Sequence, residues 1–101
     1  MPKLYEYFGL VVYFYANEHE PVHVHGECQG RESKAELLLQ NGRVVSILFR
    51  NVPGRRPLAG AKLRDFKRLV QARADDIVRR WIDFHVMRQH NEPEIITRKL
   101  K

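Results

Sequence analysis

The spacing of apolar and polar positions changes partway along the chain, from a period of two to a period near 3.6. From Leu4 to Tyr15, aromatic and β-branched residues dominate, with Gly9 among them, and this pattern favours two strands joined by a turn or bulge. The segment Val22–His25 then alternates strictly. We therefore expect a third strand whose two valines face the core and whose two histidines face outward together.

Two further apolar runs, Ser33–Leu39 and Arg43–Phe49, flank the dipeptide Asn41-Gly42. Asn-Gly between alternating or apolar runs is the strongest short-range signal for a β-hairpin. A second turn is expected over Gln29–Glu32, which is polar and contains a glycine. Together these patterns predict a small, mostly antiparallel sheet of four or five strands in the first half of the chain.

The second half predicts helices. Leu63, Phe66, Leu69 and Val70 fall on one arc at 3.6 residues per turn, opposite a charged arc. A second helix is expected to begin near Asp75 or Asp76, which would serve as N-cap or first-turn acid. Its apolar arc contains Ile77, Val78, Trp81, Ile82, Phe84 and His85.

These elements predict an α+β fold with two C-terminal helices packed on one face of the sheet and a short edge strand at the C-terminus. The edge strand is expected within the β-prone stretch Ile95–Leu100. The 101 residues are interpreted as one domain, which divides into a sheet (1–50), a connector (51–60), a helical region (61–90) and a tail (91–101).

Composition narrows the class of protein. A hydrophobic content of 44% with 30% charged residues is ordinary for a soluble domain, and no apolar run approaches the ~20 residues of a membrane span. The N-terminal residues lack a signal-peptide pattern, and the single cysteine, Cys28, suits a reducing cytoplasm, so we expect a cytoplasmic protein. The net charge of +6 is compatible with an anionic partner, which could be nucleic acid, an acidic protein or anionic lipid, and equally with a solvated basic face.

Candidate chemistry concentrates between Asn17 and Glu27, where His19, His23 and His25 lie among carboxylates. Imidazole with a carboxylate such as Glu27 is a ligand set for a divalent transition metal such as zinc. Without metal, the three histidines could act as general acids and bases. They could equally be polar residues that alternate with core valines, and the spacing alone leaves these alternatives open.

Other residues could complete such a site. Arg55 and Arg56 lie in the proline-rich connector, where they could bind phosphate, as could a stripe of helix arginines at positions 64, 68, 79 and 80. Tyr13 and Tyr15 are candidates for lining the same surface as the histidines. The sequence contains neither a glycine-rich phosphate loop nor a serine or threonine in a nucleophile elbow.

The stretch Phe14–His25 resembles the signature of a family of short bacterial proteins, domain-of-unknown-function family 4160, in which an aromatic strand precedes Asn-Asp/Glu-His, a proline and His-x-His. The resemblance extends from Met1 to roughly Phe84. It includes the apolar positions of the closing helices: Leu63, Phe66, Leu69, Val70 and Trp81. The chain departs from the pattern at Val22, where proline is frequent, and the Arg55-Arg56 pair belongs to some branches of the family.

The resemblance implies a toxin–antitoxin-type or accessory component, because family members resemble toxin-like partners encoded beside another small protein. We therefore expect a cytoplasmic component that binds RNA or a small partner protein through a histidine-rich edge. A metal-binding domain and a non-catalytic interaction module are the alternatives, and a homodimer is compatible with each of them.

Overall fold

The computed structural model describes residues 3–14, 22–88 and 92–100. Five strands come first: β1 (Lys3–Tyr7), β2 (Leu10–Tyr13), β3 (Val22–Cys28), β4 (Arg31–Gln40) and β5 (Arg43–Asn51). Two helices, α1 (Gly60–Ala72) and α2 (Ala74–His85), and a last strand, β6 (Glu94–Ile96), follow them. The predicted α+β class is confirmed, with the strands in the N-terminal half and the helices after them.

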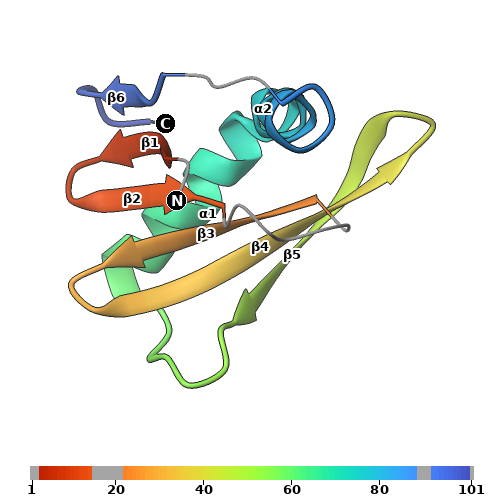
Figure 1. Cartoon of the computed structure of the whole chain (residues 1–101). Coiled ribbons are helices and arrows are strands. Elements are labelled where there is room, and N and C mark those ends of the chain that lie inside the picture. Colours follow the sequence, from red (N-terminus) through yellow and green to blue (C-terminus); the bar gives the residue numbers. More distant parts are fainter. Residues whose placement is uncertain (1–2, 15–21, 89–91, 101) are drawn as a thin grey trace.

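The strands form one mixed sheet in the order β5-β4-β3-β2-β1-β6. Neighbours from β1 to β5 are antiparallel, whereas β6 runs parallel to β1 at the outer edge, where a short C-terminal strand was predicted. The β4–β5 hairpin extends to one side of the molecule, and β6 lies at the opposite edge of the sheet (Figure 1). The histidine-bearing strand β3 therefore lies inside the sheet and not at an edge.

Three hairpins, β1–β2, β3–β4 and β4–β5, turn within two residues, the second of which is a glycine. Asn41 and Gly42 have φ values of 52° and 78°, and Gln29 and Gly30 have 52° and 77°. Positive φ at both central residues belongs to the turn type whose twist matches that of the strands. The Asn-Gly prediction is confirmed, while the second turn is shorter than expected, because Arg31 and Glu32 already belong to β4.

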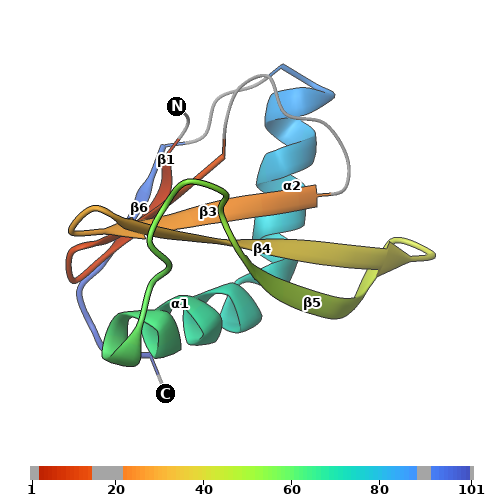
Figure 2. The ribbon, with the colours of Figure 1, turned by 90° about the horizontal axis from the view of Figure 1, so that it is seen from below.

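The helices bury one face of the sheet. Seen edge-on, α1 lies on one side of the strands, and α2 runs at a steep angle to them (Figure 2). Phe66 of α1 is fully buried over β3, close enough that a Cβ added at Gly26 would lie 2.5 Å from its ring. Ile77 and Trp81 of α2 enter the same core. Asp75 and Asp76 occupy the first turn of α2, as predicted, without a side-chain cap hydrogen bond.

None of the helices in the described part of the chain is long and apolar enough to cross a membrane.

Candidate functional site

Strand β3 is buried on both faces. Val22 and Val24 face the core, as the alternation predicted, with exposed fractions of 4% and 0%. The expectation that the histidines face outward to solvent is wrong, because His23 and His25 are only 9% and 3% exposed. Both rings lie on the face opposite α1, with their centroids 5.5 Å apart.

A buried carboxylate holds His25. Nδ1 of His25 lies 2.9 Å from Oε2 of Glu32, the geometry of an imidazole N–H donated to a carboxylate. The Glu32 side chain is 1% exposed, so this pair is removed from solvent. The contact commits Nδ1 to Glu32, so any proton transfer or metal ligation by this ring would use Nε2. Burying such a pair costs desolvation energy, which makes the cluster a candidate for function.

Register explains how these residues meet. Across the Gln29-Gly30 turn, Glu27 pairs with Glu32, and Tyr13 of β2 pairs with His25. Directly paired residues share a sheet face, so all four side chains project on the side away from α1. Tyr13 stacks on the His25 ring at 5.7 Å with an angle of 18° between the ring planes.

Arg55 closes the cluster from the connector. Its guanidinium lies 3.6 Å from the Glu32 carboxylate and 3.5 Å from that of Glu27, whose other contact is the Tyr13 hydroxyl at 3.4 Å. The connector is tied to β4 by a backbone hydrogen bond from Glu32 N–H to the Arg56 carbonyl, 2.8 Å long. Arg55 thus joins the cluster, whereas the Arg56 side chain is exposed. We call Tyr13, His23, His25, Glu27, Glu32 and Arg55 the histidine cluster.

Two of the predicted site residues, His19 and Tyr15, lie outside the described residues. Within the described ranges, no group of three or more His, Cys, Asp or Glu side chains is arranged to hold a metal ion. The Glu27 carboxylate, proposed as a ligand, contacts Tyr13 and Arg55 instead. A carboxylate on the second nitrogen of a histidine is the usual outer contact of a zinc ligand, so a metal site here would need His19 beside His23 and His25.

Sequence patterns alone did not identify Glu32 as a site residue. Interpreting Gln29–Glu32 as a turn removed this residue from consideration, although a two-residue Gln29-Gly30 turn places Glu32 across from Glu27 and diagonal to His25. The pairing signal was therefore present in the sequence.

A second candidate site lies on α1 and the C-terminal segment. It consists of six cations: Lys62, Arg64, Lys67, Arg68, Arg98 and Lys99. The Arg68 guanidinium lies 3.3 Å from the Leu100 carbonyl, and the Lys62 ammonium contacts the Phe8 carbonyl. These contacts bring α1, the C-terminal segment and the β1–β2 turn together. We call the six cations the basic surface.

The basic surface keeps its charge. In the described part of the chain, no ion pair involves any of the six cations. Arg79 and Arg80 of α2, by contrast, donate to Asp76 at 2.6 Å and 2.8 Å. The predicted stripe of four helix arginines therefore divides: Arg79 and Arg80 are paired, whereas Arg64 and Arg68 have no carboxylate partner among the described residues.

Asp76 is the centre of the neutralised region on α2. Burial raises the pKa of Asp76, but hydrogen bonds donated by Tyr5, Arg79 and Arg80 outweigh it and bring the pKa down to about 2. Burial, with the nearby Asp76 carboxylate, raises the pKa of the Tyr5 hydroxyl well above its ordinary value. This region is an ion-pair network within α2 that a hydrogen bond from the Tyr5 hydroxyl ties to β1.

Comparison with known proteins gives a family whose description states no activity. The model of the family described as "Domain of unknown function (DUF4160)" matches residues 9–82. No curated protein and no solved structure matched the chain. The matched segment contains β2 to β5, α1 and most of α2, and hence most of both candidate sites.

Proposed function

Because the chain belongs to the DUF4160 family, whose description gives no activity, we propose its function from the geometry: it binds RNA as a toxin–antitoxin-type or accessory component. One observation carries this proposal. Among the residues that the structure describes, the cations of the basic surface have no carboxylate partner, whereas Arg79 and Arg80 of α2 are neutralised by Asp76. Lys and Arg clustered along a helix are the electrostatic footprint of a nucleic-acid-binding protein.

The geometry also favours α1 over the connector as the first contact. Arg55 is engaged by Glu27 and Glu32, so a phosphate there would have to displace an existing ion pair. On α1, Asp65 is the only acidic residue between Gly60 and Ala72. If four to six of the surface cations contact phosphate, log Kd for a single strand should change with log salt by roughly 3 to 4.

Fluorescence anisotropy of a labelled single-stranded 20-nucleotide RNA at several salt concentrations tests the proposal. The variant Arg64→Glu/Lys67→Glu should bind at least 10-fold more weakly at low salt, with the salt slope reduced by about 1.4. The matched control is Arg43→Glu/Arg88→Glu, which changes net charge equally at exposed positions outside the basic surface. Equal losses in the two double variants would overturn the assignment of binding to this surface.

The same titration separates the anionic alternatives. Poly-glutamate stands for an acidic protein, and single-stranded DNA of the same sequence stands for a general nucleic acid. Unlabelled RNA is expected to displace the labelled RNA from the basic surface, whereas poly-glutamate at equal charge should displace it poorly. Competition as strong from poly-glutamate as from RNA would favour an acidic protein partner instead.

A second candidate function, RNA cleavage at the histidine cluster, is favoured by the His25–Glu32 pair beside a second imidazole. In such a cleavage the RNA 2′-hydroxyl attacks phosphorus and gives its proton to one imidazole. The leaving 5′-oxygen takes a proton from the other, which yields a cyclic phosphate. Because His23 and His25 are almost covered, RNA would reach them only after the surrounding side chains move, and we therefore place cleavage second to binding.

Cleavage is tested by incubating labelled RNA with wild type, His23→Ala and His25→Ala, and by comparing growth inhibition on expression. The cleavage hypothesis expects cyclic-phosphate products from wild type that both variants lack, while RNA affinity at the basic surface is retained. Intact RNA with wild type, or equal cleavage by all three proteins, would refute it without affecting the binding proposal.

A further inference from the structure

Phe8 occupies an unfavourable position for its side chain. It is the first of two residues, Phe8 and Gly9, that connect β1 to β2, and its φ is 48°. The same place in the other two tight hairpins is taken by polar residues, Gln29 and Asn41. Left-handed backbone is disfavoured for a bulky aromatic residue, and strain of this kind is often associated with function. Packing offers little in return, since 43% of Phe8 is exposed.

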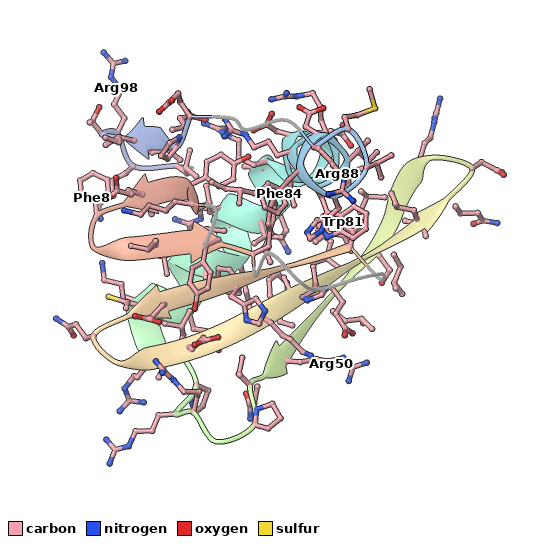
Figure 3. The ribbon with its side chains drawn as sticks, viewed as in Figure 1. Phe8, Arg50, Trp81, Phe84, Arg88 and Arg98 are labelled. Carbon is pink, nitrogen blue, oxygen red and sulfur yellow. The ribbon has the colours of Figure 1, made fainter. Side chains whose placement is uncertain are left out.

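The surroundings of Phe8 are cationic. The ammonium group of Lys99 lies 4.1 Å from the centroid of the Phe8 ring, and that of Lys62 contacts the Phe8 carbonyl. The Tyr7 ring meets the Phe8 ring edge-on at 4.9 Å, and the Tyr7 hydroxyl accepts a 3.0 Å hydrogen bond from Leu100 N–H. An exposed aromatic ring is thus fixed inside the basic surface. Phe8 and Arg98 project outward at the same end of the molecule (Figure 3).

We propose that Phe8 is a stacking platform for an unpaired base of single-stranded RNA, which would use the ring face that Lys99 does not cover, with Lys62 and Lys99 placed for the flanking phosphates. This inference rests on the proposed RNA-binding function and specifies its substrate class. Single-strand-binding proteins combine a cationic surface with aromatic side chains on which bases stack. In a duplex the base faces are covered by neighbouring pairs, so the site should discriminate against double-stranded RNA.

Three substitutions at position 8 separate stacking from folding. Phe8→Asn suits the turn conformation, so it should unfold at the same or a higher temperature while binding single-stranded RNA about 5- to 100-fold more weakly. Phe8→Leu keeps an apolar side chain without a π-face and should lose a similar factor. Phe8→Trp should bind RNA at least as tightly as wild type does. RNA should quench the fluorescence of the new tryptophan, whereas the native Trp81 is buried and out of reach.

The charge and aromatic contributions fail separately. If wild type binds no RNA, the proposed function fails, and this inference fails with it. If wild type binds with the expected salt slope but Phe8→Asn binds equally well, only the stacking platform is refuted. A duplex of the same sequence bound as tightly as the single strand would also overturn it. Weaker binding by Phe8→Asn with an unchanged salt slope is the result that the inference expects.

Discussion

Replacing Glu32 by glutamine should destabilise the protein far more than the same replacement at Glu36. Glu32 is 1% exposed and holds Nδ1 of His25 at 2.9 Å, with Arg55 nearby at 3.6 Å. The amide keeps the shape but weakens a charge-assisted hydrogen bond inside the protein, which we expect to cost about 1–3 kcal/mol. Glu36 pairs with Arg50, whose side chain is 54% exposed, so its loss should cost less than about 1 kcal/mol.

Urea unfolding followed by circular dichroism measures both variants, with the slopes compared to confirm that the transitions are equivalent. Glu32→Ala extends the series, because it leaves a buried imidazole without its carboxylate and should cost about 3–5 kcal/mol. Equal losses for Glu32→Gln and Glu36→Gln would contradict the interpretation that the histidine cluster is a buried, mutually dependent unit.

Three further outcomes follow from the packing and the charges. Gly26→Ala should lower the free energy of unfolding in urea by about 1–3 kcal/mol, because the new Cβ would meet the Phe66 ring at 2.5 Å. A second substitution, Phe66→Leu, should recover part of that loss. No effect of Gly26→Ala would mean that α1 does not pack against β3 as described. Because the pKa of Asp76 is lowered to about 2, its carboxylate should contribute stability that is present above pH 4 and lost as the pH falls toward 2. Asp76→Asn should therefore be less stable than wild type by about 1 kcal/mol at pH 6, after allowance for solvent screening, and by almost nothing at pH 2. A difference in stability that does not narrow between these pH values would contradict this. Tyr5→Phe should cost about 0.5–1.5 kcal/mol near neutral pH through the lost hydrogen bond to Asp76, and the loss should shrink in the Asp76→Asn background.

Much of the fold was predictable because its signals are local. The Asn41-Gly42 turn, the inward valines of β3 and the apolar arc of α1 each depend on neighbouring residues, and all three were confirmed. The parallel pairing of β6 with β1 joins residues almost ninety positions apart, so only the presence of a short edge strand could be anticipated, not its partner.

The sites were harder to predict because they depend on tertiary pairing. Alternation placed His23 and His25 on one face, but whether that face is covered depends on segments distant in sequence, and burial was therefore mispredicted. Whether the charge of a cation is neutralised similarly depends on its neighbours in the fold. Arg68 and Arg80 look alike in sequence, yet only Arg80 lies against a carboxylate.

The most direct test of RNA binding is the change in backbone amide chemical shifts when a 12-nucleotide single-stranded RNA is added to the folded protein. RNA binding at the basic surface predicts that the largest changes lie at Gly60–Arg68, at 97–100 and at Phe8 and Gly9, with small changes along α2. Changes concentrated on α2 or on the β4–β5 hairpin, or no changes at all, would contradict it.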